Sequence, residues 1–258
     1  MIEDDKKAAE SHKSPGKKRV SMRQSRQGWR LVRYVLFAVI WVFSSLLASQ
    51  FIVGLLLGLL LGEKIMEPAW SGVYSLISDS LAVFLTVYAL PKFWKKWAVS
   101  REEIGLRGLP TWTDIGLGAV GYIASTLLAM LVVSLFNLIP WFDANEAQDV
   151  GFSLYLVGGE RIIAFLVLVV FAPIVEELIF RGWLYGKLRS RLGMISSIII
   201  TSALFGLMHF QWNVGVNVFC LSVVLCGMRE ITGTIYAGIL THMIKNGIAF
   251  YLLYVLGI

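Results

Sequence analysis

The sequence predicts an all-α fold, a polytopic transmembrane helical bundle of about seven membrane helices and at most eight. The chain has 258 residues, of which 57% are hydrophobic, whereas soluble domains contain about 45–50% apolar residues. Several uncharged runs reach or approach the roughly 20 residues that cross a bilayer as a helix. These runs are continuously apolar, whereas the strands of a membrane barrel alternate. Together these observations favour a helical bundle over a soluble domain or a β-barrel.

The positive charge of the chain is concentrated at its N-terminus. Residues 1–33 contain ten Lys and Arg against four Asp and Glu, and the rest of the chain contains thirteen of each. The basic balance is therefore no argument for a nucleic-acid partner. We expect residues 1–33 to form a basic, disordered cytoplasmic tail near anionic lipid headgroups, and residues 34–258 to form the membrane domain. The first apolar run is too long for the core of a cleavable signal peptide.

Charged residues, glycines and prolines divide the membrane domain into seven predicted spans. The spans cover residues 34–62, 68–91, 115–140, 162–190, 194–210, 213–228 and 234–258. Most Lys and Arg between the spans fall in segments 92–107 and 187–191 and at Arg229, which this topology places on one side. Because cytoplasmic loops carry the excess of Lys and Arg, the N-terminus is expected in the cytoplasm. With seven spans, the C-terminus is then expected on the outer side of the cell membrane.

One stretch of the fourth span, Pro173 to Arg181, carries two adjacent carboxylates and an arginine. An ionised carboxylate at membrane depth costs roughly 2.5 kcal/mol or more, so such groups usually have a function or a partner. Glu177 and Arg181 are four residues apart and can pair, whereas Glu176 is rotated by about 100° around the helix. We expect Glu177 and Arg181 to form a supporting ion pair and Glu176 to face a cavity as a general base or acid. The alternative is a cluster that merely anchors the helix end.

Two of the three histidines, His209 and His242, lie inside predicted spans. Glu176 lies sixteen residues before the turn near Leu192, and His209 lies seventeen after it. At about 1.5 Å per residue, an antiparallel helix pair brings these two groups to the same depth. His242 and Asn246 are four residues apart and share a helix face. The sequence therefore predicts one cavity that contains all four side chains.

Such a cavity has the parts needed for peptide-bond hydrolysis. Glu176 and His209 can hold or deprotonate a water, with or without a metal, and His242 and Asn246 can donate hydrogen bonds to an oxyanion. The chain has no HExxH zinc motif, no Gly-x-Gly-Asp aspartyl signature and no Gly-x-Ser with a suitably placed histidine. Two alternatives stay open: a membrane scaffold or immunity protein that binds a partner without cutting it, and a proton-coupled transporter. The absence of a visible internal repeat disfavours the transporter.

Three motifs occur in order on successive predicted spans, and together they resemble a known family. The motifs are Glu176-Glu-x-x-x-Arg181, Phe205-x-x-x-His209 and His242-x-x-x-Asn246. They are similar to the motifs of the CAAX protease and bacteriocin-processing family, also called the Abi family, which includes the type II CAAX prenyl endopeptidases. The resemblance covers about residues 173–246. It implies an intramembrane endopeptidase with a conical catalytic cavity in the core of the bundle.

The resemblance also implies roles and partners. Carried over by motif, Glu176 activates the water, His209 assists it, and His242 and Asn246 form the oxyanion site. Glu176, His209 and His242 can hold Zn²⁺ or another divalent metal, although the same residues suffice without one. The expected substrate is a membrane-associated peptide or protein. The short loops resemble those of bacterial members, which favours leader, pheromone or bacteriocin precursors over a prenylated protein. The resemblance does not indicate an oligomeric state.

Two further ionisable residues, Asp79 and Lys245, fall inside predicted spans. We expect Asp79 to make an interhelical hydrogen bond or to line the cavity. Lys245 lies on a different helix face from His242 and Asn246. We therefore expect it to snorkel or to pair, for instance with Asp79, rather than to take part in catalysis.

Overall fold

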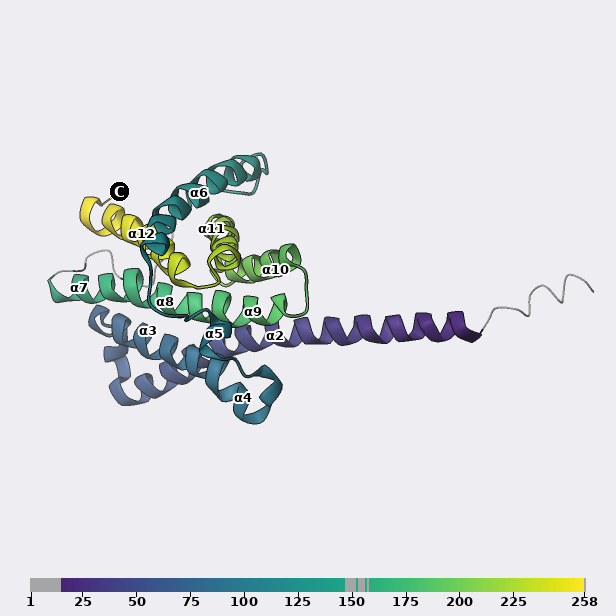
Figure 1. Ribbon diagram of the computed structural model, residues 1–258. Helices are drawn as coiled ribbons and strands as arrows, with labels where there is room; N and C mark the ends of the chain where they lie inside the picture. Colours follow the sequence, from purple (N-terminus) through teal and green to yellow (C-terminus); the bar gives the residue numbers. More distant parts are fainter. Residues whose placement is uncertain (1–14, 147–151, 153–155, 157, 258) are drawn as a thin grey trace, which may run out of the picture. The chain divides into compact units, whose positions relative to one another are not determined.

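Helices make up most of the computed structural model, which describes residues 15–146, 152, 156 and 158–257 and contains no strand in that part of the chain (Figure 1). The chain divides into two compact units, residues 1–38 and residues 39–258. Among the described residues, six helices are long and apolar enough to cross a membrane, and α10 (Met194–Leu207) is a shorter apolar helix. The six are Gln27–Ile65, Trp70–Ala89, Trp112–Phe136, Gly159–Arg189, Trp212–Thr232 and Tyr236–Leu256. This confirms the prediction of an all-α polytopic bundle.

The first helix, α2 (Pro15–Leu61), begins well before the predicted first span. Residues 1–14 of the predicted tail lie outside the described residues, but the tail from Pro15 to Arg33 is helical here, whereas we expected disorder. Proline is favoured in the first turn of a helix. The Lys, Arg, Met and Gln residues that follow are good helix formers, so the helix of the apolar run extends into the basic segment.

A continuous helical rod, residues 159–189, carries the two adjacent carboxylates, Glu176 and Glu177. It consists of α7 (Gly159–Phe165), α8 (Ala172–Glu177) and α9 (Tyr185–Arg189), which are joined by the π-helical segments Leu166–Phe171 and Leu178–Leu184. The first π-helical segment ends beside Pro173. Proline has no N–H to donate to the helix, so the regular ladder of hydrogen bonds is interrupted there. Single π turns of this kind occur frequently at functional sites.

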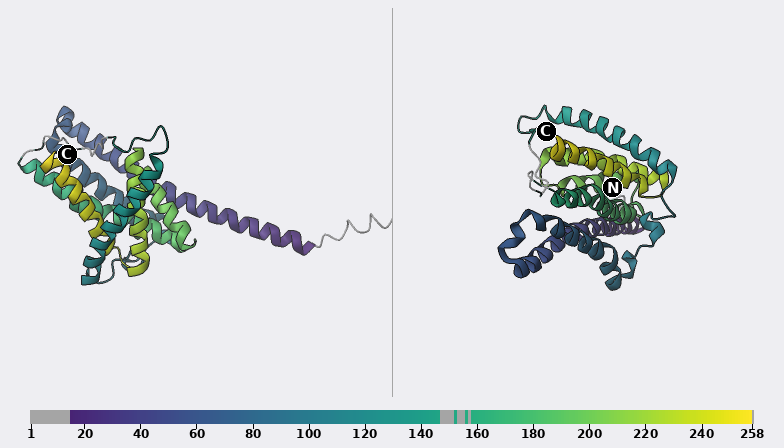
Figure 2. Two further views of the ribbon diagram at one scale, coloured as in Figure 1. Left: turned by 90° about the horizontal axis from the view of Figure 1, so that it is seen from above. Right: turned by 90° about the vertical axis from the view of Figure 1, so that its left-hand side faces the viewer.

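The second unit places this rod between two sets of helices (Figures 1 and 2). On one side α3 (Pro68–Val83) packs against α7 and α8, and on the other α12 (Tyr236–Tyr251) packs against α8. Helices α6 (Trp112–Phe136) and α11 (Trp212–Thr232) pack against α12, and α10 packs against α11. The α10–α11 contact is close, because a Cβ atom on Gly206 would lie 2.7 Å from the Gly215 carbonyl oxygen. Small residues at helix crossings are typical of membrane bundles.

The basic linker before α6 is anchored at one end of the bundle. Its short helices are α4 (Leu90–Phe93) and α5 (Arg101–Ile104), and Ser100 and Glu103 cap α5 reciprocally. Lys187 of α9 donates to the Ala98 carbonyl at 2.6 Å, and Arg229 of α11 donates to the Glu103 carbonyl at 2.8 Å. The three basic segments that the sequence predicts on one side of the membrane therefore contact one another in the structure.

Candidate active site

Glu177 and Arg181 form a buried ion pair inside the rod. Their side chains are 0% and 1% exposed, and Arg181 Nη1 lies 2.8 Å from Glu177 Oε1. The guanidinium carbon also lies 4.4 Å from the centre of the Phe205 ring, which is a cation–π contact. Within the described chain, the other two guanidinium nitrogens, Nε and Nη2, have no hydrogen-bond partner. Glu177 therefore supplies the charge that compensates Arg181, and neither residue is accessible to a substrate.

Glu176 has different surroundings, although it is the next residue. Its side chain is 32% exposed, while its Oε2 atom is buried and lies 3.6 Å from His242 Nε2. It also interacts electrostatically with Asp79 of α3, His209 and Lys245. Of the two adjacent carboxylates, Glu176 is thus the one that can meet water or a substrate.

His242 of α12 lies between the two carboxylates. Its Nδ1 atom is 3.3 Å from Glu177 Oε1, and its Nε2 atom faces Glu176. A carboxylate only accepts, so Nδ1 donates to Glu177, and this contact fixes both the orientation of the ring and the nitrogen that faces the site. From the sequence we expected Glu177 to pair with Arg181 alone, and the contact with His242 was not predicted.

A glycine on α12 makes the contact between Glu177 and His242 possible. A Cβ atom on Gly238 would lie 3.0 Å from Glu177 Oε2. Gly238 precedes His242 by four residues, so both residues share a helix face against the carboxylate. The spacing Gly238-x-x-x-His242 was the available signal, but a glycine four residues before a histidine is too common to carry a prediction alone.

His209 comes to the site from the end of α10. Its Nδ1 atom lies 2.9 Å from the Phe205 carbonyl oxygen, which only accepts, so Nδ1 carries the hydrogen and Nε2 remains an acceptor. The Phe205 ring lies edge-on to the rings of His209 and His242, at centroid distances of 5.2 and 5.9 Å. Phe205 is 1% exposed. This one buried ring therefore packs against both imidazoles and the Arg181 guanidinium.

Asn246 holds α12 against the rod through one of its amide hydrogens. Asn246 Nδ2 donates to the Leu168 carbonyl at 2.9 Å. In the adjoining turn the Ala172 N–H bonds to the Val167 carbonyl, five residues back. The next donor in this register would be residue 173, but Pro173 has no N–H. Leu168 is therefore left without a helical partner, and Asn246 supplies one. The second amide hydrogen of Asn246 remains available.

Three predicted features remain: the metal site, Asp79 and Lys245. The structure shows no group of three His, Cys, Asp or Glu side chains in its described residues that could hold a metal ion. A metal held by Glu176, His209 and His242 stays a prediction, and the mechanism below uses no metal. Asp79 and Lys245 form no ion pair with each other in the described part of the chain. Lys245 instead lines a cavity beside the site.

A protein-family model matches part of the chain. The family model of the type II CAAX prenyl endopeptidase Rce1-like proteins matches residues 158–248. This interval contains all three motifs and every residue of the candidate site. Neither the curated proteins nor the solved structures contain a match to the chain. The match supports an intramembrane endopeptidase kind of function. Residues 158–248 are thus similar to the Rce1-like type II CAAX prenyl endopeptidases, in agreement with the resemblance of the three motifs.

Proposed function

We propose that the protein is an intramembrane endopeptidase that hydrolyses a peptide bond of a membrane-associated peptide or protein, with a water activated by Glu176. One observation carries this proposal: Glu176 keeps an accessible side chain beside His242, whereas the adjacent Glu177 is fully buried in an ion pair. The two carboxylates thus have separate roles, one in chemistry and one in support. The match to an endopeptidase family supports the same conclusion.

In the proposed reaction Glu176 takes a proton from the water as the oxygen attacks the substrate carbonyl. His209 accepts a hydrogen bond from this water at Nε2, because its Nδ1–H is committed to the Phe205 carbonyl. The peptide bond then breaks, and Glu176 returns the proton to the leaving amine. A positioned general base and acid of this kind contributes about 10²–10⁴-fold to the rate.

The oxyanion that forms on the substrate carbonyl needs hydrogen-bond donors. Asn246 offers its second amide hydrogen, the first being bound to Leu168. His242 directs its Nδ1–H at Glu177, so it donates from Nε2 only when the ring carries both protons. The carboxylates on either side compensate the charge of that form. The combined donors stabilise charge that develops only in the transition state.

Membrane orientation and substrate type are further parts of the proposal. The linker, the end of α9 and the end of α11 contact one another through Lys187 and Arg229. We assign this basic end to the cytoplasm by the positive-inside rule, which places the N-terminus there and the C-terminus outside. The substrates that we propose are peptide precursors, as in bacterial members of the family, rather than prenylated proteins.

A cleavage assay in nanodiscs tests the proposed function. A library of fluorogenic peptides is offered to the wild-type protein, to Glu176→Gln and to Glu160→Gln, a control on the same rod. We expect Glu176→Gln to lose at least about 100-fold in rate, and Glu160→Gln to cleave like wild type. Cleavage that survives in Glu176→Gln would contradict the mechanism. A cellular phenotype that needs the protein but not Glu176 would favour the scaffold function.

A further inference from the structure

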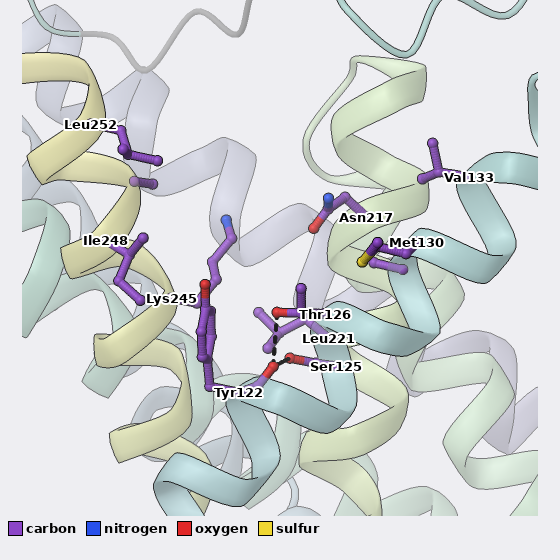
Figure 3. Close-up of a pocket in the computed structure, with 12 residues that line it drawn as sticks. Tyr122, Ser125, Thr126, Met130, Val133, Asn217, Leu221, Lys245, Ile248 and Leu252 are labelled. Atoms are coloured by element: carbon purple, nitrogen blue, oxygen red, sulfur yellow. Dashed lines mark hydrogen bonds between the residues drawn. The ribbon is translucent and has the colours of Figure 1, made fainter. Parts of the chain in front are cut away.

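A cavity of about 330 Å³ lies between α6, α11 and α12, next to the candidate active site (Figure 3). Pockets that hold small ligands usually measure about 300–1,000 Å³. Most of the lining is apolar and includes Met130, Leu221 and Ile248. Lys245 extends into this cavity from α12. The cavity is therefore an apolar space with a cation in its wall.

Lys245 lies near the middle of its candidate membrane span. It is nine residues from the start of the candidate span Tyr236–Leu256, or about 13 Å along the helix axis, and even farther from its end. Its ammonium makes no hydrogen bond or ion pair with any described residue, but it interacts electrostatically with Glu176. An ionisable residue at such depth is expensive, and it usually marks a binding site or a transport path. Snorkelling, which we expected from the sequence, stays a prediction.

The polar groups around Lys245 complement an anion. Asn217 from α11 and Tyr122 from α6 add an amide and a phenol hydroxyl to the lining, and the lining contains no Asp or Glu. Ser125 and Thr126 both donate to the Tyr122 carbonyl at 2.9 Å, so their hydrogens are already used (Figure 3). The donors that remain for a ligand are therefore those of Lys245, Asn217 and Tyr122. Charge-assisted hydrogen bonds from such donors to a carboxylate are among the strongest in proteins.

We propose that this cavity is a substrate subsite in which Lys245 binds a carboxylate that the peptide carries close to its scissile bond. Lys245 follows His242 by three residues, about 4.5 Å along the helix, and precedes Asn246 directly. An extended peptide advances about 3.3–3.6 Å per residue. A carboxylate bound at Lys245 therefore belongs to a residue within one or two positions of the cleaved bond, and the apolar lining holds its neighbours. This inference rests on the proposed function.

The carboxylate can come from a Glu side chain or from the C-terminus of the peptide, and one experiment distinguishes these two sources. A peptide library carries a single Glu or, in the matched set, a single Gln at each position, and each member is made with a C-terminal acid and a C-terminal amide. Cleavage is measured for wild type, Lys245→Met, Lys245→Arg and Glu160→Gln, a control outside the lining. Lys245→Met removes the charge but keeps an unbranched apolar stem, so the fold is retained.

We expect wild type to prefer either the Glu peptides or the C-terminal acids by about 10–100-fold in kcat/KM, the usual effect of a hydrogen bond to a charged group. The preference should vanish in Lys245→Met, persist in Lys245→Arg and persist in Glu160→Gln. A preference that persists in Lys245→Met, or its absence in wild type, would overturn the subsite.

A binding experiment tests the subsite independently of catalysis. The same peptides, fluorescently labelled, are titrated onto Glu176→Gln and onto the double variant Glu176→Gln/Lys245→Met in nanodiscs. Tighter binding of carboxylate peptides to the first protein alone supports the subsite even when wild type cleaves nothing, a result that would refute only the protease function. Cleavage by wild type without any carboxylate preference in binding would refute only the subsite.

Discussion

Replacing Glu176 and Glu177 by glutamine, one at a time, distinguishes the carboxylate that stabilises the fold from the carboxylate that acts in catalysis. Glu177 is 0% exposed and lies 2.8 Å from Arg181, which also contacts the Phe205 ring. The substitution Glu177→Gln keeps the shape of the side chain and an oxygen that accepts from Arg181, but it removes the charge. Arg181 is then a buried cation without a counterion.

The size of the effect follows from this burial. Removing one partner of a buried pair usually costs about 3–5 kcal/mol, because the remaining charge stays desolvated. At about 2–4 °C per kcal/mol for a chain of this size, the midpoint of thermal unfolding should fall by about 6–20 °C. Glu176→Gln changes a side chain that is 32% exposed and lies 3.6 Å from His242 Nε2, on a ring that is charged only when both nitrogens carry a proton. Pairs of that kind contribute about 0–1 kcal/mol, so this variant should unfold close to wild type.

The assay is thermal unfolding of both variants and wild type in the same detergent, followed by intrinsic tryptophan fluorescence. Glu176→Gln serves as the matched control, since it makes the same chemical change one residue away. We expect an unstable Glu177 variant and a stable but inactive Glu176 variant. Equal loss of stability in the two variants, or a stable Glu177→Gln protein, would refute the assignment of Glu177 as the supporting carboxylate.

Three further predictions concern the same site. Gly238→Ala places a Cβ atom 3.0 Å from Glu177 Oε2, so it should displace the Glu177 carboxylate from His242 and lower kcat by about tenfold or more. Gly227→Ala is the control, because its Cβ meets nothing within 4 Å, and it should leave cleavage unchanged. Asn246→Leu leaves the Leu168 carbonyl unpaired and should destabilise the protein by about 1–3 kcal/mol in thermal unfolding; unchanged stability would refute this role. Cleavage should persist in the presence of a chelator, and a loss that Zn²⁺ restores would instead establish a metal enzyme.

The positions of the membrane helices could be predicted well from the sequence. Length and apolarity decide whether a segment crosses the bilayer, and both are properties of the segment alone. The predicted fourth span, residues 162–190, compares with the candidate span Gly159–Arg189, and the predicted fifth, residues 194–210, compares with α10, Met194–Leu207. The exception is the start of α2, where helix propensity continues beyond the apolar run to Pro15.

The contacts inside the site depend on how each helix is rotated about its axis, and spacing does not determine this rotation. The sequence indicated that Glu177 can pair with Arg181 and that His242 lies on the same face as Asn246. It did not indicate that His242 would contact Glu177, because that contact requires α12 to approach α8 closely at Gly238. Such an approach is a property of two packed surfaces, so only the structure reveals it.

Pro173 connects the local sequence to the geometry of the site. It lies three residues before Glu176 and removes the donor that would have bonded to the Leu168 carbonyl. In an apolar bundle an unpaired carbonyl is expensive, so it requires a partner from another helix. Asn246 supplies that partner, and it lies one helical turn beyond His242. A slide of α12 by one residue, about 1.5 Å, would break this hydrogen bond and would also move His242 away from both carboxylates. A proline in one helix therefore sets the depth of a histidine in another, and this hydrogen bond fixes His242 at the height of Glu176.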